Sequence, residues 1–506
     1  MPINLIRIIY PALACVWLAG CAVSPDGLKL EQLQTMSISH LNRVTANQEP
    51  LAGSVSLYDA MARALKYNLD YKVELMQASL RLNELRLSHY AMLPNAVVSS
   101  GYSSRNNYLS SGELNIKTGV ETGPRTTSSE RSNTLSDVTF SWNILDFGLS
   151  YIRARQAADK VLIAEEAKRK VIQKIVEDVR SAYWRAVSSE RMVTKLKGLE
   201  GRTRTALTNT RMLAKTQETS PITALTYERE LIEIKRAAQE LQRELSVAKT
   251  QLAALMNLPP DSQFSLAADG LNASAPPLEV DPQEMIDAAL LNRSELRDIT
   301  YQRRINVHEA HAALLELIPG IQLYGGENYD TNKYLAHKEW VSWGAKAGWN
   351  VIKVFQYPAK RAVIEGQDAL LDARALALTM AIMTQVHVSR IRYLNASREL
   401  VTAREYFDVQ NRLLRQMRNE AAADRISEQT LIREELNTLV AEAKRDIAFA
   451  NAQNAYANIF SSIGFDPHAS DISISMDVNE LAKSLSSLWL ERGDFGAHTK
   501  ISLALR

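Results

Sequence analysis

The sequence of 506 residues predicts a mainly α-helical protein with a small β part, internally duplicated. Short motifs recur along the chain at a constant distance of 225 residues and then, further on, of 207 residues. Two very long segments repeat apolar or small residues with a mean period of 3.5, which is the pattern of a coiled-coil seam. Segments ahead of each long helix alternate apolar and polar residues, as strands with one apolar face do. These three observations together predict the fold class.

Two offsets relate the copies, because the loop between the first two strands is longer in the first copy. The difference is 18 residues, and the stretch from Asn106 to Asn133 is rich in Ser, Thr, Asn and Gly, as a loop should be. Offsets that hold over a hundred residues or more make chance matching a poor explanation. The matched positions include Ala64-Leu65 with Ala289-Leu290, Pro94 with Pro319, Trp142 with Trp349, and Val179 with Val386.

The first 20 residues predict a lipoprotein signal peptide. A single positive charge, Arg7, precedes an apolar run from Ile8 to Leu18 that is too short to span a membrane. The run ends at Leu18-Ala19-Gly20-Cys21, which resembles a bacterial lipobox, where the cysteine is acylated, for example with palmitate, after cleavage. We therefore expect lipidation at Cys21 and an extended polar tether over residues 21–56. The open alternative is an uncleaved or unlipidated signal.

Residues 57–260 are predicted to form the first repeat. The long helix is expected to span on the order of 100 Å, and its seam residues are spaced alternately by three and four. The expected elements are a helix from Leu57 to about Leu93 that Pro94 ends, strands over about 95–105 and 134–147, one helix from Leu149 to about Lys215, and another from Ile222 to Asn257.

Residues 282–467 are predicted to form the second repeat, after a linker over residues 261–281. Residues 468–506 form a C-terminal tail of mixed character. The expected elements are a helix from Pro282 to Ile318, strands over about 320–330 and 341–352, a long helix from about Pro358 to Glu420, and a last helix that ends at Ile463-Gly464.

Four strands of about ten residues suit a membrane, but four strands cannot close a barrel with a lumen. An open sheet in lipid leaves unpaired backbone groups, each at several kcal/mol. Closure must therefore come from other copies of the chain, and three copies give twelve strands. The long helices are compatible with this arrangement, since they can lie side by side around a ring.

The duplicated plan and three short motifs resemble the TolC-like outer-membrane factor family, and the lipobox resembles its lipoprotein branch. The motifs are Ala64-Leu65-Lys66-Tyr67-Asn68, the break at Leu93-Pro94, and the stretch from Trp142 to Gly148. The resemblance implies a homotrimer with a twelve-stranded β-barrel in the outer membrane of a Gram-negative bacterium and a helical tunnel in the periplasm. Ala22 after the cysteine agrees with that destination.

Such tunnels are exit ducts, which the resemblance implies pass substrates from a periplasmic adaptor protein and an inner-membrane pump to the exterior. Efflux of small molecules and type I secretion of a protein both remain open as the transport process. The rival interpretation is a structural coiled-coil lipoprotein that spans the periplasm without forming a pore.

The turns between the long helices are the expected sites of adaptor docking and of the tunnel entrance. The family usually has glycine there, whereas this chain has Gln217 and Asp424, so the gating residues are not carried over. A plain solvated turn is the alternative. The candidate tip residues are Gln217, Thr219, Ser220, Asp424, Arg425 and Ser427.

Aromatic residues cluster at the predicted strands, where interfacial girdles of a membrane barrel are expected. Ordinary sheet packing is the alternative explanation for them. The candidate membrane-interface residues are Tyr102, Trp142, Phe147, Tyr324, Trp340, Trp343 and Trp349.

The sequence contains no strong signature of catalysis, a metal or another cofactor. A net charge of +2 gives no case for nucleic acid as a partner. His308 and His311 lie one residue short of the zinc spacing His-Glu-x-x-His, so we expect a solvated helix face there. Glu165-Glu166 is an adjacent pair whose side chains diverge around a helix. We therefore predict that the chain is not an enzyme.

Overall fold

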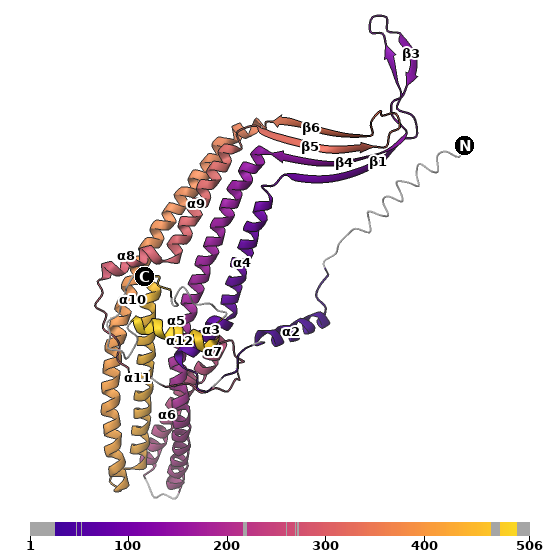
Figure 1. The fold of residues 1–506 in the computed structure, drawn as a ribbon. Coiled ribbons are helices and arrows are strands. Elements are labelled where there is room, and N and C mark those ends of the chain that lie inside the picture. The colour runs from indigo at the N-terminus through magenta and orange to yellow at the C-terminus, as the bar shows by residue number, and fades with distance from the viewer. Residues whose placement is uncertain are drawn as a thin grey trace.

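A computed structural model describes residues 26–46, 48–51, 53–215, 220–259, 261–268, 270, 273–466 and 476–492. The expected signal peptide, Cys21, Gln217 and Thr219 lie outside these residues. The molecule is elongated, with a β-sheet at one end and long helices that run away from it (Figure 1). Shorter helices gather around the middle of its length.

The element bounds repeat with the two offsets that the sequence predicts, so the internal duplication is confirmed. The first offset, 225 residues, relates the leading helices and one strand of each copy. The second offset, 207 residues, relates the long helices to one another. The leading elements are α3 (Leu57–Tyr67), α4 (Leu69–Tyr90) and β1 (Asn95–Ser104) in the first copy, and α8 (Pro282–Asn292), α9 (Ser294–Leu315) and β5 (Gly320–Asp330) in the second.

The expectation of one unbroken helix before the first strand of each copy is wrong. Asn68 interrupts the first copy with extended backbone, and its side-chain oxygen accepts a hydrogen bond from the Tyr71 amide, which caps α4. Arg293 interrupts the second copy in the same way, at φ −65° and ψ 125°. Both elbows let a short helix pack on the core while the next helix runs to the sheet.

The four predicted strands pair in one antiparallel sheet, in the order β1-β4-β5-β6. β4 spans Ser132–Asn143 and β6 spans Glu339–Gly348. The predicted strands extended too far toward the helices, because Asn143 and Asn350 accept the amides of Leu145 and Ile352 and start the helices there. The long loop of the first copy holds an unpredicted hairpin of β2 (Ser111–Leu114) and β3 (Glu121–Thr126).

Two helices dominate the length of the molecule. α5 (Ile144–Lys215) has 72 residues and α10 (Ile352–Ala422) has 71. α10 begins earlier than expected and accommodates Pro358 within its second turn. The return helices are α6 (Pro221–Ser246), α7 (Ala248–Leu255) and α11 (Glu428–Ser462), so the helix predicted over residues 222–257 is broken at Val247.

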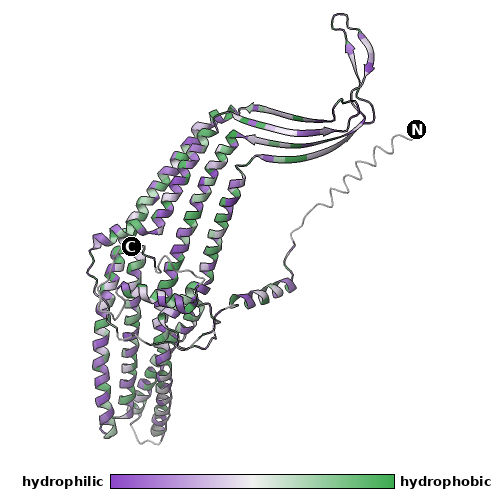
Figure 2. Ribbon diagram, viewed as in Figure 1, coloured by the Kyte–Doolittle hydropathy of each residue, from purple (hydrophilic) through white to green (hydrophobic). Residues whose placement is uncertain are grey.

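The predicted coiled-coil seams are the parts of the long helices that face the core. Val179 and Val386, which the second offset relates, are both fully buried. Apolar and polar residues alternate along each long helix (Figure 2). The seam residues are Ile172, Ile175, Val179, Ala182, Ala186, Ser189, Val193 and Leu196 on α5, and Thr379, Ile382, Val386, Ser389, Tyr393, Ala396, Leu400 and Ala403 on α10, each buried or half-buried.

Two helices lie in segments for which the sequence predicts no helix. α2 (Leu30–Val44) replaces part of the expected extended tether. α12 (Val478–Glu491) lies in the tail and packs against α3. Its Trp489 is 1% exposed and lies between two guanidinium groups, with Arg180 at 4.3 Å and Arg492 at 5.4 Å from the ring centre. These contacts fix the described part of the tail to the middle of the molecule.

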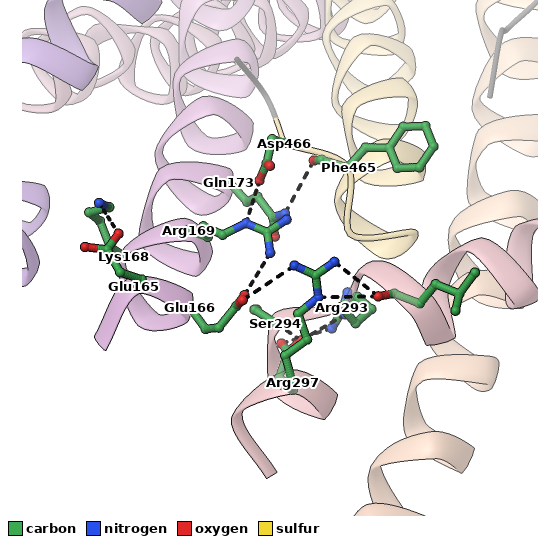
Figure 3. A network of polar contacts seen from close by, with 12 residues as sticks. Glu165, Glu166, Lys168, Arg169, Gln173, Arg293, Ser294, Arg297, Phe465 and Asp466 are labelled. Carbon is green, nitrogen blue, oxygen red and sulfur yellow. Dashed lines mark hydrogen bonds and ion pairs between the residues drawn. The ribbon is translucent and has the colours of Figure 1, made fainter. Parts of the chain in front are cut away.

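A network of charged side chains ties α5, α9 and the end of α11 together (Figure 3). Arg169 on α5 pairs with Asp466 at 2.9 Å and with Glu166 at 2.8 Å, and Arg297 on α9 lies 3.6 Å from Glu166. Arg293 donates to the Ser461 carbonyl at 3.1 Å, which satisfies a backbone acceptor that the end of α11 would otherwise expose. The network joins the two repeats at mid-length.

Candidate functional site

The described residues contain no group of three or more metal-ligating side chains. His308, expected on a solvated face, is instead buried against α5, with Nε2 3.7 Å from Asp159. Burial and the nearby Arg155 lower the pKa of His308 below its usual range, so the imidazole is neutral at neutral pH. His311 remains exposed. His308 therefore packs between helices, and His311 lies on a solvated face as the sequence predicts.

The larger of the two cavities described has a volume of about 360 Å³ and lies between α5, α9 and α10. Its lining is polar, and its carboxylate, Glu309, is occupied by Arg153 at 2.5 Å and Lys360 at 3.5 Å. Although burial raises the pKa of Glu309, the hydrogen bonds and charge of Arg153 outweigh it and hold the pKa low. A paired, ionised carboxylate is unsuited to general acid or base work.

The sheet has two faces of opposite polarity, which the pairing register defines. On one face the cross-strand neighbours are mostly apolar. On the other they are mostly hydroxyl, amide or charged residues. The apolar face includes Val98, Val138, Phe140, Trp142, Leu323, Val341 and Trp343, and the polar face includes Ser99, Asp137, Thr139, Ser141, Gln322, Asn328, Ser342 and Lys346.

Alternating exposure along β4 shows which face is concave. Val138, Phe140 and Trp142 are 39%, 57% and 38% exposed, whereas Thr139 and Ser141 between them are less exposed than any of these three. Side chains on the inside of a curved sheet crowd one another, so the polar face is the concave one. A sheet that curls with its polar face inward is suited to enclose water and to present its apolar face to lipid.

The predicted interface aromatics fall on both faces of the sheet. Tyr102, Trp142 and Trp343 lie on the apolar face, whereas Tyr324 and Trp340 lie on the polar face. Tyr324 packs over Gly344, where an added Cβ atom would lie 2.5 Å from the hydroxyl oxygen of Tyr324. Phe147 lies in the first turns of α5, with its ring 5.5 Å from that of Trp142, and Trp349 follows β6 and donates to the Leu317 carbonyl.

The helices next to the sheet form a row in the order α4, α5, α9, α10. The two ends of the row each carry a stripe of exposed residues with alternating spacings of three and four, which is the coiled-coil period. On α4 the stripe is Leu69, Val73, Met76, Leu80, Asn83, Leu87 and Tyr90, and on α10 it is Val363, Gly366, Leu370, Ala373, Ala377 and Met380.

The side chains of the α4 stripe are mostly large, and those of the α10 stripe include both large and small ones. Leu80 is 56% exposed and Met380 is 64% exposed. Among the described helices, α10 is the one with a stretch long and apolar enough to cross a membrane, and 17% of that stretch is buried.

The described tip residues lie in the turns between long helices. Ser220 precedes α6, and Ser427 caps α11 by accepting the Thr430 amide at 3.2 Å. Asp424 has a φ of +53°, a left-handed conformation that aspartate tolerates better than most residues. Arg425 pairs with Glu420 at 3.4 Å within the same turn.

Ion pairs near the tips join the two helical hairpins, and sequence reasoning missed them. Glu435 on α11 contacts Arg202 on α5 and lies 3.2 Å from Arg418 on α10. Arg433 lies 3.8 Å from Glu230 on α6. Sequence alone could not place Arg202 beside Glu435 or Glu230 beside Arg433, because in each case the two residues lie on different copies of the repeat.

No protein-family model and no curated protein matches the sequence. Solved structures with the same fold do match. The channel-forming protein CusC is 15% identical with a TM-score of 0.61 over 83% of this chain and 96% of that chain. The outer-membrane channel MtrE of Neisseria gonorrhoeae is 12% identical with a TM-score of 0.61, over 88% and 98%.

A third solved structure, the outer-membrane channel CmeC of Campylobacter jejuni, covers more of this chain than either. It is 11% identical with a TM-score of 0.59, over 92% of this chain and 97% of that chain. At these identities the likeness shows the fold alone, which is the TolC-like arrangement of long helices and a few strands per chain.

Proposed function

We propose that this chain, which has the fold of TolC-like outer-membrane channels, is the exit duct of a tripartite export system. In this proposal three copies form a twelve-stranded barrel in the outer membrane of a Gram-negative bacterium. Their helices form a tunnel in the periplasm, and a periplasmic adaptor and an inner-membrane pump supply the substrate. Efflux of small molecules is the favoured process, and type I secretion of a protein is the alternative.

The observation that carries this proposal is a sheet with two unpaired edges and two faces of opposite polarity. β1 and β6 each pair with one strand only among the described elements. In lipid, each unpaired backbone group costs several kcal/mol, so the edges need partners. β1 of one copy and β6 of the next can supply them, which closes a barrel with polar residues inside.

The helical row supports the same assembly from independent residues. Once the sheets join edge to edge, α4 of one copy comes beside α10 of the next. The large side chains of the α4 stripe then face the α10 stripe, whose Gly366, Ala373 and Ala377 leave room for them, as holes accept knobs in a coiled coil. Burial of exposed leucine, valine and methionine contributes about 1.5–3 kcal/mol per fully buried side chain.

The first experiment measures native mass in mild detergent together with single-channel conductance in a planar bilayer. A conducting trimer supports the duct. A monomer or dimer without conductance contradicts it and favours the non-pore coiled-coil lipoprotein. Leu80→Glu, on the α4 stripe, should abolish the trimer, whereas Ser79→Glu, at an exposed position of the same helix outside the stripe, should leave it intact.

Two finer parts of the proposal have tests of their own. Lipidation at Cys21 predicts a mature mass that includes acyl chains and is lost in Cys21→Ser. Docking of an adaptor at the tips predicts that charge reversal at Asp424 or Arg425 reduces export in cells. The native mass of the purified trimer should be unchanged in these tip variants, because the sheet is distant from the tips (Figure 1).

A further inference from the structure

The strands of the four-stranded sheet hold five charged residues, and the register divides them between the two faces. Asp137, Asp330 and Lys346 belong to the concave polar face. Glu327 and Glu339 belong to the convex apolar face, where they pair with Val341 and Tyr329. Each face of the sheet therefore carries acidic residues, so substitutions on the apolar face can serve as controls for substitutions on the polar face.

Asp137 is held against the wall by hydroxyl groups. Ser99 on β1 and Thr139 on the same strand donate to its two carboxylate oxygens, the second at 2.9 Å. Its cross-strand neighbour on β5 is Asn328, whose amide donates to Ser342 at 2.9 Å. The carboxylate thus lies in the middle of the sheet beside Ser99 and Asn328, and no lysine or arginine belongs to that row of paired residues.

Lys346 occupies the same face near the helical end of the sheet. It pairs with Gln322, which in turn pairs with Asn143, the last residue of β4. Asp137 lies six residues before Asn143, so the two charged rows are about 20 Å apart along the strand. That distance exceeds the Debye length of about 10 Å in 0.1 M salt, so the two charges act separately on a passing ion.

Asp330 lies at the outer rim and is engaged in local structure. Its carboxylate accepts the Asn332 amide at 2.9 Å and the Asn133 side chain at 3.3 Å. Asp330 therefore lies at the rim, and the charged residues further along the polar face are one carboxylate at mid-sheet, Asp137, and one ammonium group near the helices, Lys346.

We propose that Asp137 and Lys346 form two rings of opposite charge on the lumen wall and set the charge selectivity of the barrel. This inference rests on the trimeric duct proposed above, in which each residue occurs three times around the lumen. The Asp137 ring concentrates cations at mid-barrel, and the Lys346 ring concentrates anions near its helical end. The ratio of cation to anion permeability then depends on the balance of the two rings.

The size of the effect follows from screened electrostatics. Three charges, each about 10 Å from a passing ion in 0.1 M salt, change its local concentration about twofold. Because the Debye length falls to about 3 Å at 1 M salt, the effect should disappear there. Selectivity from the rings is therefore a low-salt property.

The test measures the reversal potential of the purified protein in a planar bilayer under a KCl gradient. Asp137→Asn should lower the potassium-to-chloride permeability ratio by up to about fourfold at 0.1 M, because the ring both concentrates potassium and depletes chloride about twofold, and Lys346→Gln should raise it by a similar factor. Both changes should vanish at 1 M salt. Glu327→Gln and Glu339→Gln remove charge from the convex face and should leave the ratio unchanged.

A cysteine series gives a second readout that does not need neutral variants. The sequence has two cysteines, Cys15 and Cys21, both outside the strands. An anionic water-soluble thiol reagent should restore wild-type selectivity to Asp137→Cys, and it should not change the current through Glu327→Cys.

Opposite shifts in the two lumen variants, with silent convex-face controls, support the inference. If the protein conducts but neither lumen substitution changes the potassium-to-chloride permeability ratio, the inference is overturned and the proposed duct stands. A wild-type protein that forms no pore overturns the proposed duct, and this inference with it.

Discussion

Gly464 ends α11 at a close approach to the α8–α9 elbow, and Gly464→Ala should destabilise the chain strongly. Its φ is +76°, where alanine costs about 1–2 kcal/mol. A Cβ atom there would also lie 2.7 Å from the Asn292 carbonyl carbon and 2.8 Å from the Arg293 nitrogen, whereas ordinary contacts begin near 3.4 Å. Since both neighbours are backbone, the elbow itself must move.

The chain offers a control that separates the two causes. Gly53 has nearly the same φ, +77°, but a Cβ atom there meets nothing within 4 Å. Gly53→Ala should therefore lose only the backbone contribution, about 1–2 kcal/mol. Gly464→Ala should lose about 1–3 kcal/mol more through overpacking.

The assay is thermal unfolding by circular dichroism in a fixed detergent, at one protein concentration and scan rate. For a chain of this size, each kcal/mol shifts Tm by about 2 °C or less. Gly464→Ala should therefore melt several degrees below Gly53→Ala. Equal shifts for the two variants would refute the argument, because the close approach to Asn292 would then have no energetic consequence.

Three further predictions test other parts of the fold. The hydrogen bond with Asp477 and the ion pair with Lys66 lower the pKa of Glu49 to about 2. Because the folded pKa is depressed, the stabilisation is present above pH 4.5 and lost as pH falls toward 2. Glu49→Gln should therefore make Tm depend less on pH in that window. A pH dependence of Tm that equals the wild type's would contradict this. Trp489→Ala should cost about 3–5 kcal/mol and expose α12 to protease, so an equally resistant variant would argue against its docking role. Asn257→Ala should cost about 1–2 kcal/mol, because Asn257 has a φ of +58°, and Asn257→Gly should recover the backbone part, as Tm differences would show.

Much of the architecture follows from periodicity, which is a local property of the sequence. The 3.5-residue spacing identifies the buried sides of α5 and α10, and it does so because a helix presents residues three and four apart on one side. Alternation identifies the strands, and constant offsets identify the duplication. The same local logic explains the equivalent ends at Asn257 and Gly464, since a chain that leaves a helix in this way needs positive φ.

Other features were readable in principle. In α12, Val478, Leu481, Leu485 and Trp489 are spaced by three, four and four, which is the helical pattern that the tail as a whole obscures. The elbow at Asn68 has a local cause, because its side chain caps α4. Arg293 makes no such cap, so the packing of α8 against the core explains why the helix breaks there.

The sequence by itself determined the element types, the duplication and the buried seams, because these depend on residue spacing within one segment. Only the tertiary structure decided which strand lies beside which, and with it the face on which each side chain stands. Because Trp340 and Trp343 are three residues apart, alternation already places them on opposite faces of a strand, and the pairing register decides which of the two shares a face with the apolar residues of the other strands. A shift by one residue would exchange those faces, and the pairing that prevents it joins β4 to β5 from the other copy of the repeat.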